Sequence, residues 1–218
     1  MKKSTRTSLV ILALLCMGAV LYSGFIPLSE KFLVHQLQAG PLILSMKPIQ
    51  QMQVTSCGEA AITMAYSYAH PEASLQESNV IAYASQMGLF TADRPPFTSP
   101  ASMLKIAKNY TDEISSGRAF TQTQGLGLLI QKIQHDQPVI IDVLTRLNDP
   151  DSGAHFVVVM GVSLDETREN AILIHYNNPL TARSEVAPWS GANGLWNAWQ
   201  NNGDPGGPGW WMVVGAPD

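Results

Sequence analysis

Two long apolar runs of β character constrain the fold of this chain most. Residues 139–144 (VIIDVL) and 154–162 (AHFVVVMGV) are rich in β-branched side chains, and a turn-forming cluster, NDPDSG at residues 148–153, separates them. Shorter β runs follow at residues 171–176 and 210–214. Consecutive strands joined by turns favour an antiparallel sheet in the second half of the chain.

Helical spacing dominates the first half. Apolar residues recur at helical intervals in four segments, and we expect helices from Cys57 to Tyr68, over residues 80–87, from Pro100 onward and over residues 126–134. Ser56 with Glu59, and Ser74 with Glu77, stand in capping-box spacing before the first two. Helices followed by strands indicate an α+β fold, with N-terminal helices packed on a C-terminal antiparallel sheet in one domain over residues 29–218.

The N-terminus has the layout of an export signal. Lys2, Lys3 and Arg6 precede an uncharged apolar run from residue 9 to 22, and further apolar residues continue to Leu28. We expect residues 1–28 to act as a signal peptide or as an N-terminal membrane anchor. If the segment is retained, residues 9–28 associate with the membrane and the domain lies outside. Either way, the domain is predicted to be exported across the inner membrane and to be periplasmic or secreted.

Charge and cysteine content exclude several classes of protein. The net charge is −4, and setting aside the three basic residues before residue 9 leaves 10 basic against 17 acidic residues. An acidic domain is unsuited to nucleic acid, which requires a basic face. The cysteines are only Cys16 and Cys57, so a disulfide framework is excluded, and the five histidines show no zinc-ligand spacing. No metal or organic cofactor is expected.

Cys57 is the candidate nucleophile. It stands at the predicted start of a helix, where free backbone amides and the helix dipole favour a thiolate over a thiol. Gly58, which follows it, is expected to leave room for the backbone of a substrate. Cysteine at a helix start is also compatible with a small buried side chain without chemistry, so the assignment depends on partners elsewhere in the chain.

His155 and Asn178 are the expected partners of Cys57. His155 stands at the start of a strand after a polar turn, and Asn178 stands at the end of the next strand, where its amide can hold the imidazole. Gln51, six residues before Cys57, is the candidate oxyanion donor. Asn177 is an alternative to Asn178. The other histidines, expected to be packing or surface residues, are His35, His70, His135 and His175. Gln50 and Gln53 compete with Gln51 as oxyanion donor, but only Gln51 has the six-residue spacing to Cys57.

As a set, these residues resemble a known family. Gln51 with Cys57-Gly58 (Q-x5-C-G), followed by HFVV from His155 and by Asn178-Pro179, is similar to the peptidase C39-like group of papain-like cysteine peptidases. The resemblance covers about residues 45 to 215. It implies a papain-like fold, with Cys57 as nucleophile, His155 as general base, Asn178 as orienting residue and Gln51 as oxyanion donor.

The expected function is that of an exported thiol hydrolase that cleaves a peptide or other amide bond in a peptide or protein substrate. Relatives within bacteriocin-exporting transporters generally have Asp where this chain has Asn178, and Asn cannot add charge to stabilise an imidazolium. The chain shows no transporter domain, so cleavage after a double glycine is not carried over. Two alternatives stay open, namely acyl transfer (a transamidase) by the same triad and a non-catalytic peptide-binding module of the same fold.

Overall fold

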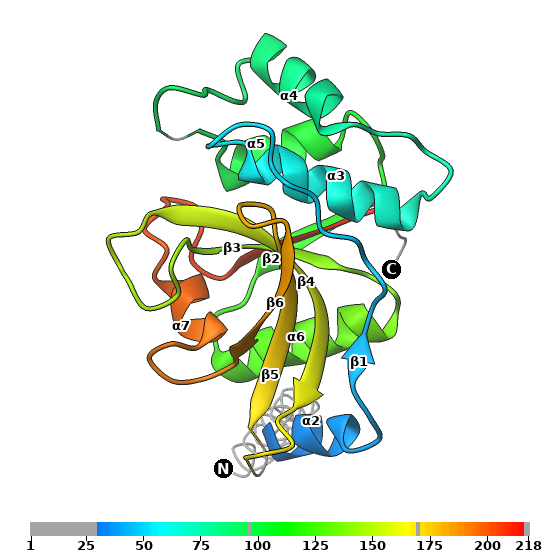
Figure 1. The fold of residues 1–218 in the computed structure, drawn as a ribbon, viewed down its shortest axis with the longest axis vertical. Helices are drawn as coiled ribbons and strands as arrows, with labels where there is room; N and C mark the ends of the chain where they lie inside the picture. The colour runs from blue at the N-terminus through cyan, green and yellow to red at the C-terminus, as the bar shows by residue number, and fades with distance from the viewer. Residues whose placement is uncertain (1–29, 96, 169–170, 216–218) are drawn as a thin grey trace, which may run out of the picture.

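The computed structural model describes residues 30–95, 97–168 and 171–215, and within them the fold is α+β (Figure 1). The helices are α2 (Glu30–Leu37), α3 (Cys57–Ala69), α4 (Glu77–Gln86), α5 (Pro100–Ala107), α6 (Gln122–Gln134) and α7 (Leu195–Gln200). The strands are β1 (Leu42–Ile43), β2 (Ile114–Arg118), β3 (Val139–Leu144), β4 (Ala154–Leu164), β5 (Ile172–Asn178), β6 (Arg183–Pro188) and β7 (Trp210–Val214).

One antiparallel sheet organises the molecule. Its strand order is β2-β7-β3-β4-β5-β6, and the short β1 pairs with the far end of β4. Gly161 permits that pairing, because a Cβ at this position would lie 2.8 Å from the carbonyl oxygen of Leu42. Since β4 and β5 are antiparallel neighbours, the first residues of β4 lie next to the last residues of β5. His155 and Asn178 therefore lie close together at one end of these two strands.

Helices cover both faces of the sheet, and each face has its own apolar core. Helices α3, α4 and α5 form a layer on one face, above the sheet in Figure 1. Alternate strand residues such as Ile140, Val158 and Met212 point into this layer. Their neighbours Ile141 and Val157 point to the opposite face, toward α2, α6 and α7. This alternation explains why β3 and β4 are apolar on consecutive residues.

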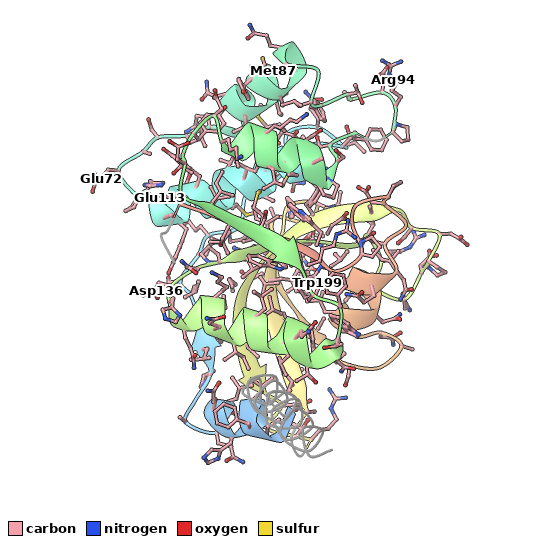
Figure 2. The ribbon with its side chains drawn as sticks, turned by 180° about the vertical axis from the view of Figure 1, so that it is seen from behind. Glu72, Met87, Arg94, Glu113, Asp136 and Trp199 are labelled. Carbon is pink, nitrogen blue, oxygen red and sulfur yellow. The ribbon has the colours of Figure 1, made fainter. Side chains whose placement is uncertain are left out.

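Tryptophans complete the second core. Trp189 and Trp199 are almost fully buried, and their rings pack against one another and against Trp196. The Trp199 indole N–H donates to the backbone oxygen of Trp210 at 2.7 Å. Figure 2, viewed from behind, shows Trp199 on α7 beside the ribbon of α6. These rings thus cover the face of the sheet that is opposite α3.

The prediction of an α+β fold with N-terminal helices on an antiparallel sheet is confirmed. The four helices expected from periodicity correspond to α3, α4, α5 and α6, and the apolar runs correspond to β3, β4, β5 and β7. Two polar edge strands, β2 and β6, were not expected. In the part of the chain that the structure describes, no helix is long and apolar enough to cross a bilayer. The predicted export segment, residues 1–28, lies outside the described residues.

Candidate active site

Cys57 is the first residue of α3, and it opens onto a cleft of about 690 Å³. His155, at the start of β4, lines the same cleft, as do the aromatic ring of Phe97 and the side chain of Leu180. The sulfur accepts a hydrogen bond from the backbone of Phe156, the residue that follows His155. The fold therefore brings the thiol and the imidazole to one cavity, although about 100 residues separate them in the sequence.

The start of α3 is fixed by a carboxylate from another helix. Glu77, the first residue of α4, accepts hydrogen bonds from the backbone N–H of Met52 at 2.9 Å and from the Ser56 hydroxyl at 2.7 Å. Ser56 also accepts a hydrogen bond from the backbone N–H of Gln53 at 3.0 Å. Glu77 is 5% exposed. It thus ties the loop before Cys57, which carries Gln51, to the start of α4.

Both predicted capping boxes are wrong. Ser56 is the N-cap of α3 but makes no side-chain capping bond, because its hydroxyl is engaged by Glu77 and Gln53. The carboxylate of Glu59 instead accepts from the hydroxyl of Thr98 at 2.7 Å. Helix α4 begins at Glu77, too late for a box with Ser74. In both cases, the glutamate that was expected to cap its own helix accepts hydrogen bonds from residues distant in sequence.

Gly58 serves packing and not access for a substrate. A Cβ at this position would lie 2.7 Å from the sulfur of Met103 and 3.3 Å from the ring of Phe156. Gly58 therefore lets α3 approach α5 and β4 closely, and the expectation that it leaves room for a substrate backbone is wrong.

His155 is held by Asn178 in a defined tautomer. The His155 Nε2 lies 2.9 Å from the Asn178 Oδ1, and the backbone N–H of Leu180 donates to the same oxygen at 3.0 Å. Because that oxygen accepts, the Nε2 of His155 must carry the proton. The neutral ring then presents the lone pair of Nδ1, which is the arrangement a general base requires.

Asn177 and the other histidines have different partners. Asn177 is fully buried, donates to the backbone oxygen of Met46 at 3.3 Å, and accepts from the Ser184 hydroxyl at 2.7 Å. It points away from His155, because successive strand residues face opposite sides of a sheet. His175 lies 2.8 Å from the Ser163 hydroxyl. The structure therefore places Asn178, and not Asn177, beside the imidazole.

Gln51 is close to the site but has other partners. Its backbone N–H donates to the Pro179 oxygen at 2.9 Å, which ties the loop before α3 to the turn after Asn178. Its side-chain amide donates both hydrogens, to the backbone oxygens of Gln53 at 2.8 Å and Val54 at 2.7 Å. The Gln51 Oε1 is buried without a partner. An oxyanion role for Gln51 thus requires residues 53–54 to release one of these hydrogens.

The electrostatics of the site favour a neutral thiol and a neutral imidazole. Burial raises the pKa of Cys57 to about 12; backbone hydrogen bonds from Phe156 and Gly58 oppose the shift, and the charges of Glu59 and Asp142 add to it. Burial lowers the pKa of His155, against the hydrogen bond to Asn178. Desolvation therefore opposes the helix dipole at Cys57, and the expectation of a thiolate at the helix start stays a prediction.

Two buried carboxyl groups, those of Asp142 and Glu59, influence the pKa of Cys57. Asp142 is fully buried on β3, and it faces α3 because it lies two residues after Ile140 on the same side of the strand. Burial, together with the charge of Asp204, raises the pKa of Asp142 well above its usual value. Burial also raises the pKa of Glu59 to about 7. At neutral pH, protons on these groups limit the negative charge near Cys57.

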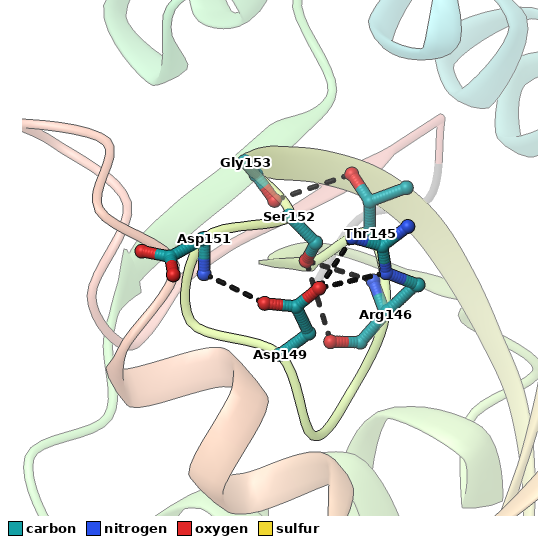
Figure 3. Close-up of polar contacts among 6 residues, drawn as sticks. All are labelled: Thr145, Arg146, Asp149, Asp151, Ser152 and Gly153. Carbon is teal, nitrogen blue, oxygen red and sulfur yellow. Dashed lines mark hydrogen bonds and ion pairs between the residues drawn. The ribbon is translucent and has the colours of Figure 1, made fainter.

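The loop between β3 and β4 lines the cleft, and polar contacts within the loop hold its two ends together (Figure 3). Between β3 and β4, the Thr145 backbone N–H donates to Gly153 at 2.9 Å, and the Arg146 N–H donates to the Ser152 hydroxyl at 2.9 Å. The Arg146 guanidinium also pairs with the carboxylate of Asp149. Gly153 has a φ of 76°, which a glycine adopts without strain. This turn delivers the chain into β4 and so sets the position of His155.

A family comparison agrees with this geometry. The model of the Peptidase_C39-like family matches residues 43–206, a span that contains α3 and the strands bearing His155 and Asn178. The chain belongs to the Peptidase_C39-like family. The resemblance inferred from the sequence is therefore confirmed, and the α+β architecture is consistent with a papain-like peptidase fold. No curated protein matches the chain. At the level of its family, this Peptidase_C39-like protein is a cysteine peptidase-like hydrolase.

Sequence reasoning missed the carboxylates that support the site. Glu77 and Glu59 were assigned to capping boxes, and Asp142 and Glu185 were not considered. An acidic residue inside the apolar run VIIDVL is a usable signal for Asp142, because an unpaired buried charge is costly. Glu185 offers no comparable signal, since it lies on a polar edge strand. Among the described residues, no group of three or more His, Cys, Asp or Glu side chains could hold a metal ion.

Proposed function

We propose that this protein is an exported thiol hydrolase that cleaves a peptide bond with Cys57 as nucleophile, His155 as general base and Asn178 as orienting residue. The observation that carries the proposal is the 2.9 Å contact between the His155 Nε2 and the Asn178 Oδ1, with His155 and Cys57 opening onto one cleft. A buried histidine held in this tautomer and a cysteine that lines the same cleft are the parts of a nucleophilic triad.

The neutral resting pair favours proton transfer during attack. As the Cys57 sulfur attacks the carbonyl carbon, its proton passes to the His155 Nδ1 and a C–S bond forms. The imidazolium then gives that proton to the leaving amine, the C–N bond breaks, and a thioester remains. Water, deprotonated by His155, attacks the thioester to release the acid and restore the thiol. Backbone amides at the start of α3, with Gln51 if residues 53–54 release it, stabilise the oxyanion.

The cleft also favours certain substrates. Asp151 and Asp204 line it, and the described lining residues include no lysine or arginine. Apolar contact is offered by Phe97 and Leu180. We expect peptides with apolar and neutral or basic side chains to be cleaved in preference to acidic ones.

The test uses the full-length protein in a Cys16→Ser background, so that Cys57 is the sole thiol. Incubation with a mixture of unrelated peptides, followed by mass spectrometry, is expected to show cleavage that Cys57→Ala and His155→Ala abolish. Asn178→Ala should reduce it strongly, whereas Asn177→Ser, on the opposite face of β5, should retain it if the fold is preserved. A trapped thioester with Cys57 identifies the nucleophile directly. Cleavage that survives in Cys57→Ala would contradict the proposal.

A second candidate function is a non-catalytic peptide-binding module. Two observations favour it, namely the raised pKa of Cys57 and the engagement of both Gln51 amide hydrogens by residues 53–54. This candidate predicts that peptides bind in the cleft with equal affinity to the parent protein and to Cys57→Ala, without turnover in either. The same peptide mixture therefore separates the two candidates.

Export is proposed from the sequence of residues 1–28 alone. Lys2, Lys3 and Arg6 before the apolar run favour translocation of the domain. A fusion of residues 1–28 to a reporter that is active only outside the inner membrane tests this, and Lys2→Glu with Lys3→Glu and Arg6→Glu should impair export. Sequencing the N-terminus of the mature protein distinguishes a cleaved signal from a retained anchor.

A further inference from the structure

Glu185 on β6 lies behind the residue that orients His155. Its carboxylate accepts hydrogen bonds from the Asn178 side-chain N–H group, at 3.2 Å to each oxygen. The Tyr176 hydroxyl donates to it at 3.0 Å and the Thr181 hydroxyl at 2.6 Å. These three donors hold the carboxylate in one place, on the same face of the sheet as Asn178.

This contact, together with the hydrogen bond from the Leu180 N–H to the Asn178 Oδ1, decides which way the Asn178 amide points. A side-chain amide can turn over and exchange its oxygen for its nitrogen, which would leave the His155 Nε2 facing N–H donors. A carboxylate accepts and cannot donate, so the Asn178 N–H group must face Glu185 and its oxygen must face His155. Glu185, acting through Asn178 and alongside the Leu180 N–H, therefore favours the tautomer of His155 that leaves Nδ1 free.

Glu185 also supplies charge. Hydrogen bonds from Thr181, Asn178 and Tyr176, with the charge of His155, hold the pKa of Glu185 below its usual value in spite of its desolvation. Reciprocally, the charge of Glu185 raises the pKa of His155, against the lowering that burial causes. Glu185 is thus ionised where an imidazolium would form, and an Asn at position 178 lacks the negative charge that an Asp would provide there.

We propose that Glu185 is a positioning residue of the active site, which acts through Asn178 to fix the tautomer of His155 and to stabilise its protonated form. The inference rests on the proposed function, and it extends the triad to a Cys-His-Asn-Glu series. No proton is transferred to Glu185. Its negative charge lies next to the Asn178 amide while the proton moves between Cys57 and His155.

Other titratable groups around His155 must be separated from Glu185. Cys57 approaches from α3, and Asp142 lies on β3, opposite Phe156, the residue that follows His155. Tyr176 lies on β5, and Arg183 lies opposite Asn178 on β6. These groups are unchanged in a Glu185 variant, so a shift on substitution belongs to Glu185 itself.

The experiment follows His155 directly by NMR, in the full-length protein with isotope-labelled histidine. His155→Ala identifies the resonance, and its titration is compared in the parent, Glu185→Gln, Glu185→Ala and Glu72→Gln. Glu72 is an exposed glutamate on a loop away from the sheet, so it controls for the loss of one negative charge (Figure 2). Glu185→Gln keeps an acceptor for the Asn178 amide but removes the charge, whereas Glu185→Ala removes both.

Glu185→Gln should lower the pKa of His155, and Glu185→Ala should in addition move part of the ring proton from Nε2 to Nδ1, which ring ¹⁵N shifts report. Glu72→Gln should do neither. In the cleavage assay, kcat/KM should fall roughly tenfold in Glu185→Gln, the size expected for losing one charge-assisted contact, and Glu185→Asp should recover part of it.

The outcomes separate this inference from the proposed function. An unchanged His155 titration in folded Glu185→Gln and Glu185→Ala overturns the role of Glu185, even if the parent protein cleaves peptides. If the parent cleaves nothing but His155 still responds to Glu185, the proposed function fails and the coupling between Glu185 and His155 stands. Glu185→Asp, which keeps the carboxylate, serves as the second variant should Glu185→Ala not fold.

Discussion

Replacing Glu59 by glutamine should make the protein more stable at alkaline pH. Glu59 is fully buried, its Oε1 accepts from Thr98, and its Oε2 has no partner. Burial raises its pKa from 4.5 to about 7. The folded state therefore retains a proton that the unfolded state releases, so stability falls as pH rises from about 4.5 to about 7 and is constant above that. At 1.4 kcal/mol per pKa unit, the loss is about 3 kcal/mol.

The assay is urea unfolding of the parent and of Glu59→Gln at pH 4.5 and pH 8. Other groups, such as Asp142, also reduce stability as pH rises, but they are common to both proteins and cancel in the comparison. The parent should lose about 3 kcal/mol more than Glu59→Gln between the two pH values. The glutamine side chain would have one N–H without a partner, just as protonated Glu59 has an O–H without a partner. At pH 4.5 the two proteins should therefore differ little in their free energy of unfolding.

The exposed control Glu72→Gln should keep the pH dependence of the parent. If Glu59→Gln loses as much stability as the parent between pH 4.5 and pH 8, then Glu59 is not protonated in the folded state and the reasoning is wrong. A second consequence concerns the thiol, because the charge of Glu59 raises the pKa of Cys57. Above pH 7, Glu59→Gln should therefore increase the rate at which iodoacetamide alkylates Cys57.

Three further predictions concern the start of α3. With a pKa of about 12, Cys57 should be alkylated at pH 8.5 at least about 100-fold more slowly than a free thiol, and rapid reaction at pH 7 would refute the neutral pair. Gly58→Ala should lower the free energy of unfolding in urea by about 1–3 kcal/mol, because its Cβ would lie 2.7 Å from the Met103 sulfur. An unchanged midpoint would contradict this, since it would mean that Met103 on α5 moves aside without cost. Glu77→Ala should cost about 1–3 kcal/mol by leaving the Ser56 hydroxyl without its acceptor, and peptide cleavage should slow with it; unchanged stability and turnover would show that Glu77 does not hold this loop.

The elements that periodicity defines strongly could be predicted from the sequence. Helix α3 and strands β3 and β4 have long apolar patterns, and their burial against one another fixes them. Strands β2 (ISSGR) and β6 (RSEVAP) could not be predicted, because an edge strand pairs on one side only and needs little apolar surface. Their assignment depends on the strand that they meet, which local sequence does not specify.

The partners of a side chain were predictable only where the fold leaves few choices. The contact between His155 and Asn178 follows from the antiparallel pairing of β4 and β5, which places the start of β4 next to the end of β5. The use of Glu77 and Glu59 could not be inferred, since capping-box spacing is a local preference worth about 1 kcal/mol. Tertiary hydrogen bonds to the Ser56 and Thr98 hydroxyls outweighed it.

In the mechanism that we propose, burial and the charge of Glu185 together allow attack without a preformed thiolate. Burial favours retention of the proton on the Cys57 sulfur, and the charges of Glu59 and Asp142 add to this effect at a pH where these groups are ionised. Glu185 is on the far side of His155, where its charge favours arrival of the proton on the imidazole. Before attack, the burial of both Cys57 and His155 dominates, and the pair stays neutral. During attack, the sulfur loses its developing charge to the new C–S bond while the imidazolium gains its own, so the charge of Glu185 acts mainly on the transition state.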